Sequence, residues 1–111
     1  MSINNLTIVR GKFEPVRETA YGDITTDFTM IGSTFDVNFS VVYVQNQTDG
    51  IMDFSISYDG VDTAFSLAPG GTLSTDMIAN QIQISAGEAA WVKYRTSPST
   101  GFVQVSAVTP V

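Results

Sequence analysis

The clearest pattern in the chain is an alternation of apolar and polar residues through its middle third. From residue 51 to 58 every second residue is apolar, ending at Tyr58, which predicts a half-buried strand with Tyr58 on its core face. Asp49-Gly50 and Asp59-Gly60 flank this strand, and Asp-Gly between alternating segments is a strong signal for a hairpin turn. The pattern therefore predicts a three-stranded meander over residues 41–65, whose apolar face the rest of the chain covers.

A similar alternation precedes the meander, over residues 35–45. Phe35, Val41 and Tyr43 share the face predicted to lie in the core. Val42 and Val44 make the opposite face apolar as well, so this segment is either a central strand or one that enters an interface. Further alternation predicts strands over residues 24–30, 73–76, 88–95 and 102–108, whereas residues 77–83 fit either one helical turn or a loop.

About eight short strands separated by Gly- and Pro-containing turns predict an all-β protein, either a β-sandwich or a jelly roll. We expect a jelly-roll β-sandwich of antiparallel strands, because long polar loops interrupt what would otherwise be a continuous meander. Residues 1–20 lack a clean period and contain Gly11 and Pro15. They predict an extended N-terminal arm, with a short edge strand near residues 6–10, followed by a single domain at residues 21–111.

Composition limits the chemistry that the chain can perform. Its 111 residues include no cysteine and no histidine, which excludes disulfides, thiolate metal sites, and Ser-His or Cys-His catalysis. The Gly70-Gly71 loop has no following lysine and no strand–loop–helix context, so a phosphate-binding loop is not predicted. We expect a protein that is not an enzyme and that needs no cofactor or metal.

Charge is unevenly distributed along the chain. The net charge is −6, yet residues 1–17 contain three basic residues and one acid. An acidic body does not favour nucleic acid, whereas a basic arm could pair with an acidic partner or simply keep the arm soluble. The sequence has neither an apolar run long enough to span a bilayer nor a secretory signal, so we expect no membrane contact and synthesis in the cytoplasm without export.

Acidic residues near the two Asp-Gly turns are the first candidate site. Asp49, Asp53, Asp59 and Asp62 could supply oxygen ligands for calcium, but their spacing does not match an EF-hand loop. Asp is also an ordinary turn residue, and this is the interpretation we favour.

The second candidate is a predicted strand face that carries Trp91, Lys93 and Arg95. An exposed Trp beside two cations could stack on a sugar or anchor a protein interface. Alternatively, Trp91 lies in the core, and the aliphatic parts of Lys93 and Arg95 extend past it to solvent. The arm, with its apolar and basic residues, could add a strand to a neighbouring sheet. The predicted interface residues are Leu6, Ile8, Arg10, Lys12, Phe13, Arg17, Val42, Val44, Trp91, Lys93 and Arg95.

Several short motifs, mostly turns, resemble those of small proteins from tailed bacteriophages. The likeness covers roughly residues 15–108. The motifs are Pro15-Val16-Arg17-Glu18, Gly22-Asp23-Ile24, the turn Asn46 to Gly50, Ser57-Tyr58-Asp59-Gly60-Val61, Leu67-Ala68-Pro69-Gly70-Gly71, Val92-Lys93 and Ser99-Thr100-Gly101. In the loop that begins at Leu67, the order of Ala68 and Pro69 is the reverse of that in the pattern it resembles, Leu-Pro-Ala-Gly-Gly. Length and predicted architecture are similar to those of the capsid decoration (staple or cement) proteins of epsilon-fifteen-type short-tailed phages. The basic arm and the Trp91 face have no counterpart in that pattern.

The resemblance implies a jelly roll bound to the outer surface of the virion, as a homodimer that clamps adjacent subunits of the major capsid protein. Two alternatives stay open. Trp91 and the acidic turns would suit a carbohydrate-binding jelly roll for host attachment, and a virion protein of this size could instead be a subunit of a collar or tail ring.

Overall fold

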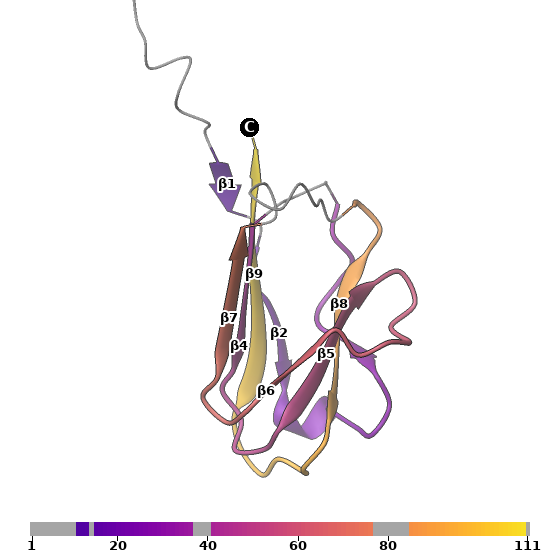
Figure 1. Ribbon diagram of the computed structural model, residues 1–111, viewed down its shortest axis with the longest axis vertical. Coiled ribbons are helices and arrows are strands. Elements are labelled where there is room, and N and C mark those ends of the chain that lie inside the picture. Colours follow the sequence, from indigo (N-terminus) through magenta and orange to yellow (C-terminus); the bar gives the residue numbers. More distant parts are fainter. Residues whose placement is uncertain (1–10, 14, 37–40, 77–84, 111) are drawn as a thin grey trace, which may run out of the picture.

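The protein is a β-sandwich, as the sequence predicts. A computed structural model describes residues 11–13, 15–36, 41–76 and 85–110. Two antiparallel sheets face each other, and their strands run along the long direction of the body (Figure 1). A short 3-10 turn, η1 (Tyr21–Asp23), is the helical element in the described part of the chain. No described helix is long and apolar enough to cross a bilayer.

The first sheet has the order β1-β9-β4-β7, and β2 also pairs with β9. Its strands are β1 (Gly11–Phe13), β2 (Arg17–Ala20), β4 (Val41–Asn46), β7 (Thr72–Asp76) and β9 (Phe102–Pro110).

The second sheet has the order β3-β8-β5-β6. Its strands are β3 (Thr29–Met30), β5 (Met52–Ser57), β6 (Phe65–Leu67) and β8 (Ala89–Tyr94).

The core fills the space between the two sheets. Apolar side chains from both inner faces are almost fully buried there, which is the main stabilising contribution in a domain of this size. Phe54 of β5 stacks on Phe65 of β6 with 5.3 Å between ring centroids. The buried cluster comprises Ile24, Ile31, Phe35, Val42, Val44, Met52, Phe54, Ala90, Val92, Val103, Val105 and Ala107.

Strand pairs are nested along the chain. From β2 onward, the first strand pairs with the last (β2 with β9), the second with the second to last (β3 with β8), and so on inward through β4 with β7 to β5 with β6. Successive pairs in this series alternate between the first and the second sheet. The chain therefore crosses repeatedly between the two layers.

The prediction of a central meander is wrong in its first half. β4 lies in the first sheet and β5 in the second, so the turn at Asp49-Gly50 joins the two layers and is not a hairpin. β5 and β6 do pair, with Phe54 opposite Phe65. An Asp-Gly turn reverses the chain, but whether the flanking strands pair depends on which of their faces must reach the core.

Two side chains predicted to lie in the core are on the surface. Tyr43 is 37% exposed and Tyr58 is 65% exposed, whereas Val42 and Val44 are buried. In β4 the even-numbered residues therefore face the core, whereas the pattern that begins at Phe35 predicts that the odd-numbered residues do. Phe35 is itself buried, but it precedes β4, and residues 37–40 between them lie outside the described part. A one-residue change of phase moves every side chain of a strand to the other face.

Elements near the N-terminus also differ from expectation. In place of a strand over residues 24–30, the chain forms only the short β3, preceded by bends. The edge strand expected at residues 6–10 lies outside the described residues. Within the expected arm, both β1 and β2 pair with β9, and their registers differ by one residue on either side of Pro15. Between these two ladders the chain before β2 has one residue more than β9, and such an extra residue is a bulge in the edge of the sheet.

Candidate functional site

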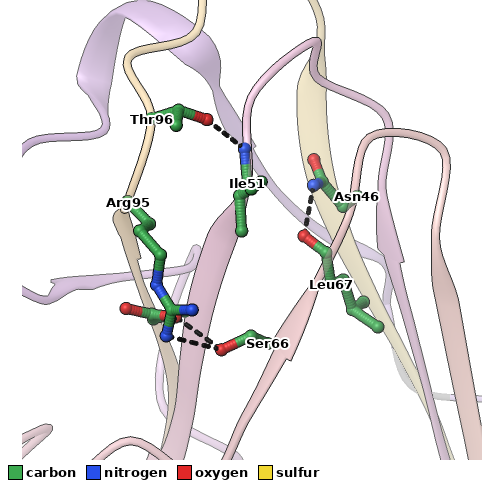
Figure 2. Close-up of polar contacts among 7 residues, drawn as sticks. Asn46, Ile51, Ser66, Leu67, Arg95 and Thr96 are labelled. Carbon is green, nitrogen blue, oxygen red and sulfur yellow. Dashed lines mark hydrogen bonds and ion pairs between the residues drawn. The ribbon is translucent and has the colours of Figure 1, made fainter.

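Asn46, the last residue of β4, links several polar segments at one end of the sandwich. Its side chain is fully buried. The amide nitrogen Nδ2 donates to the carbonyl oxygens of Gly50 (2.9 Å), Leu67 (3.0 Å) and Ala68 (3.1 Å). The contact to Leu67 connects the first sheet with β6 of the second (Figure 2). The two hydrogens of this amide are thus shared among three carbonyl oxygens, one buried and two half-buried.

The Thr48-Asp49-Gly50 turn is built on the same asparagine. Thr48 donates from its backbone N (3.0 Å) and from Oγ1 (2.6 Å) to Oδ1 of Asn46. Gly50 is also buried, and a Cβ atom at this position would overlap the carbonyl oxygen of Thr96. The turn can therefore approach the β8–β9 connection only with glycine at position 50.

Asp49 holds that β8–β9 connection in place. Its carboxylate accepts hydrogen bonds from the backbone N of Ser99 (2.7 Å), from the Ser99 hydroxyl, and from the backbone N of Thr100 (3.3 Å). The Ser99 hydroxyl, followed by these backbone donors, lowers the pKa of Asp49 below its ordinary value of 3.8, because each donor favours the ionised form. The first candidate acid therefore acts as a turn-stabilising residue.

Asp53 has a different partner on the outer face of the second sheet. Its Oδ1 atom accepts from Nη2 of Arg95 (2.9 Å) and from the hydroxyl of Ser66 (2.5 Å). Arg95 also donates to Ser66 (3.3 Å), and beside this group the Thr96 hydroxyl accepts from the backbone N of Ile51 (2.6 Å) (Figure 2). Asp53 is 10% exposed at its side chain and Arg95 58%, so the pair lies at the edge of solvent.

The four candidate acids do not form a calcium site. Asp49 and Asp53 are occupied by separate partners, and Asp59 and Asp62 are exposed. Within the described residues, no three acidic side chains approach closely enough to hold a metal ion.

Trp91 is packed beneath the β5–β6 loop. Its indole Nε1 donates to the carbonyl oxygen of Ser57 (3.1 Å), and the backbone of Gly60 lies against the ring, where a Cβ atom would overlap it. Gly60 has φ +64°, and its N donates to Oγ of Ser57 (2.9 Å). The indole is therefore half-buried with its polar atom occupied, and it does not form an open platform for a sugar.

Lys93 shares the outer face of β8 with Trp91, opposite the buried Ala90 and Val92, and Arg95 follows the end of the strand. The Nζ atom of Lys93 lies 4.7 Å from the centre of the Phe28 ring, and Arg95 is paired with Asp53. Trp91 and Lys93 are half-buried and Arg95 is exposed, and their contacts tie β8 and its end to neighbouring segments.

Arg17, predicted to contact a partner, is instead buried within this chain. Its guanidinium donates to the carbonyl oxygens of Ser33 (3.0 Å), Pro15 (3.1 Å) and Thr34 (3.1 Å). The group lies 4.4 Å from the centre of the Phe35 ring. It attaches β2 to the segment after β3, beside an open depression of about 480 Å³ lined by Pro15, Val16, Arg17, Glu18, Gly32, Ser33 and Asp36.

The other predicted interface residues fall into three groups. Val42 and Val44 belong to the core. Lys12 and Phe13 lie in β1, opposite Thr109 and Val108 of β9. Leu6, Ile8 and Arg10 lie outside the described residues.

The residue that sequence reasoning missed is Asn46. A signal was present, because Asn46 follows Val42 and Val44 on the face that points into the core. A polar residue in register with buried apolar residues must find internal hydrogen-bond partners. Together, Asn46, Thr48 and Asp49 form the hydrogen bonds that fix this turn against the neighbouring connections.

No protein family model, no curated protein and no solved structure matches the chain.

Proposed function

We propose that this protein is a non-enzymatic structural component of a tailed-phage virion, a decoration protein that binds the outside of the capsid and clamps adjacent subunits of the major capsid protein. The observation that carries the proposal is the placement of β1. This strand pairs with residues 108–110 at the end of β9, whereas β4 pairs with β9 only as far as Val108. β1 thus extends past the β4–β9 ladder at one end of the sandwich (Figure 1).

The character of the arm supports a clamping role. Residues 1–13 contain apolar residues and two of the five basic residues of an otherwise acidic chain, Arg10 and Lys12. A segment of this composition, attached where β1 extends past the sandwich, can reach across the boundary between two capsid subunits. Each copy bound in this way adds buried area where an expanding shell would first separate.

The structure of the turns supports the rigidity of the body. Asn46, Asp49 and Gly60 fix three connections through hydrogen bonds or close approach. A cement protein must transmit load between subunits without deforming, and closely tied connections favour that property.

We also propose that the sandwich is a jelly roll. The nested pairing, from β2 with β9 inward to β5 with β6, supports this topology, because a jelly roll folds an antiparallel series of strands into two layers. An experimental structure that gives the same nested order would agree with the proposal, and a different order would overturn it.

The copy number of the protein in virions tests the function. Particles of the virus that encodes the chain would be purified and the ratio of this protein to the major capsid protein measured by quantitative mass spectrometry. Hundreds of copies per particle are expected for a shell-binding protein. Six or twelve copies would indicate the alternative, a collar or tail ring, and absence from particles would overturn a virion role. Cryo-electron microscopy of the same particles would locate the copies.

A further inference from the structure

The edges of the two sheets differ in how well they are protected against pairing with another strand. β3 has two residues and β6 has three, and such short edge strands offer few hydrogen bonds. The edge formed by β1 and β2 is interrupted at Pro15 by a one-residue change of register. β7 has five residues, contains neither Pro nor Lys, and pairs along its whole length with β4 in unbroken register.

The outward-facing groups of β7 follow from the pairing with β4. The backbone N of Asn46 donates to the carbonyl oxygen of Gly71 (2.9 Å), which makes positions 46 and 71 a hydrogen-bonded pair. Such pairs recur at every second residue of an antiparallel ladder. Leu73 and Thr75 therefore direct their backbone groups toward β4, and Thr72, Ser74 and Asp76 direct theirs away from it. Among the described strands none lies on that side (Figure 1).

We propose that β7 pairs antiparallel with β7 of a second copy of this chain, so that the first sheets of the two copies become one continuous sheet. Placing Ser74 opposite the partner's Ser74 puts Thr72 opposite the partner's Asp76, and Asp76 opposite the partner's Thr72. All three residues with outward backbone groups are then in hydrogen-bonded pairs, and each pair exchanges two hydrogen bonds.

Charge favours a second copy as the occupant of this edge. Asp76 is the charged residue of β7, and the symmetric register pairs it with a threonine and not with another aspartate. The side chains of Thr72 and Ser74 are exposed, so no large group has to move before the strands meet. The edge is thus complementary to itself, which is the requirement for a two-fold interface.

Replacement of Ser74 by proline tests the proposal. The N–H of Ser74 points away from β4, so S74P leaves the β4–β7 ladder intact but removes both hydrogen bonds of the central pair. Sedimentation equilibrium should find a dimer for the unmodified chain and a dissociation constant at least about 30-fold higher for S74P, the equivalent of two hydrogen bonds. The matched control, S74T, keeps the N–H and should dimerise normally. Circular dichroism and thermal unfolding would verify that both variants are folded.

Two lysine substitutions provide a second test that does not depend on proline. In the proposed register S74K places two ammonium groups opposite each other and should weaken the dimer about threefold or more. T72K, two residues away on the same edge and face, places each new ammonium opposite the partner's Asp76 and should tighten the dimer by a similar factor. Equal effects of the two substitutions would overturn the register.

Amide hydrogen exchange would locate the interface directly. Increasing protein concentration should slow exchange at Thr72, Ser74 and Asp76, while Leu73 and Thr75 are protected at all concentrations. A chain that is monomeric at the highest attainable concentration, or a dimer without concentration-dependent protection of β7, would overturn the inference. Neither result bears on the capsid role, which the copy number tests separately.

Discussion

At the scale of single residues, the most informative side chain is Asn46. It is an amide on the buried face of a strand, where apolar residues are the rule, and it accounts for hydrogen bonds to three carbonyl groups and to Thr48. Buried polar groups of this kind contribute specificity, because the chain must reproduce one arrangement of the connected segments to satisfy them.

We expect Asn46→Ala to lower the free energy of unfolding by about 2–4 kcal/mol, because it removes the amide that bonds one buried and two half-buried carbonyl groups and accepts from Thr48. Urea denaturation followed by circular dichroism would measure the loss. Gln47→Ala is the matched control: its exposed amide donates to Gln45, and its removal should change stability by less than about 0.5 kcal/mol. Equal effects of the two substitutions would contradict the role assigned to Asn46.

Asp49 makes stability depend on pH in acid. Because its pKa is lowered in the folded state, the ionised carboxylate stabilises the fold. That stabilisation is complete above the ordinary pKa of 3.8 and is lost as the pH falls through the lower, folded value. Asp49→Asn should therefore reduce the dependence of unfolding free energy on pH in the region just below 3.8.

The measurement is a series of urea titrations between neutral pH and acid. Asp59→Asn, a substitution of the exposed aspartate in the other Asp-Gly turn, serves as the control for the loss of one negative charge. If Asp49→Asn and the unmodified chain lose stability in parallel on acidification, the hydrogen bonds to Ser99 and Thr100 do not stabilise the folded state.

At the scale of elements, the two Asp-Gly turns show what a local pattern can predict. Both reverse the chain, as the sequence indicates. Asp59-Gly60 connects two paired strands, whereas Asp49-Gly50 connects strands in different sheets. Strand pairing is decided by which faces meet in the core, and this information is spread over the whole chain. The sequence therefore predicts β5, β7, β8 and β9 closely but not the sheet to which β4 belongs.

The candidate site was predictable to a smaller extent. Alternation along β8 correctly places Trp91 and Lys93 on its outer face, but the cover over Trp91 comes from Gly60, 31 positions earlier. The burial of Arg17 likewise depends on carbonyl groups of Ser33 and Thr34. Contacts between segments that are distant in the sequence cannot be predicted from the pattern of either segment alone.

Glycine 60 provides a test at this scale. We expect Gly60→Ala to destabilise the fold by more than about 2 kcal/mol, because its φ is positive and the new methyl group overlaps Trp91. Gly70→Ala is the control, since Gly70 has φ +77° but open space around it, and it should cost about 1 kcal/mol. Trp91 fluorescence should shift in the first variant and not in the second. Similar losses in both would show that backbone conformation alone matters.

At the scale of the whole molecule, the proposed function assigns separate tasks to the sandwich and to the N-terminal arm. Deleting residues 1–13 removes β1 but keeps β2, its ladder with β9 and the contacts of Arg17. We expect the truncated protein to retain the fold and the dimer but to lose capsid binding, as measured by co-sedimentation with shells.

A full-length variant with Arg10→Gln and Lys12→Gln serves as the control, because it retains the strand and removes two charges. If this variant binds shells more weakly than the unmodified chain at low salt but equally well at high salt, the two charges contribute to capsid binding electrostatically. If the truncated protein decorates shells as tightly as the full chain, the arm is not the clamp.

The central position of β9 also governs when the protein can fold. β9 pairs with β1, β2 and β4, and the hydrogen bond between Gln104 and Glu18 spans 86 positions of the chain. During synthesis, the strands on either side of β9 emerge from the ribosome long before the strand that joins them. Such long-range closure makes folding slow and leaves the early strands exposed. Production of the protein should therefore benefit from low temperature, which weakens hydrophobic association of the exposed strands.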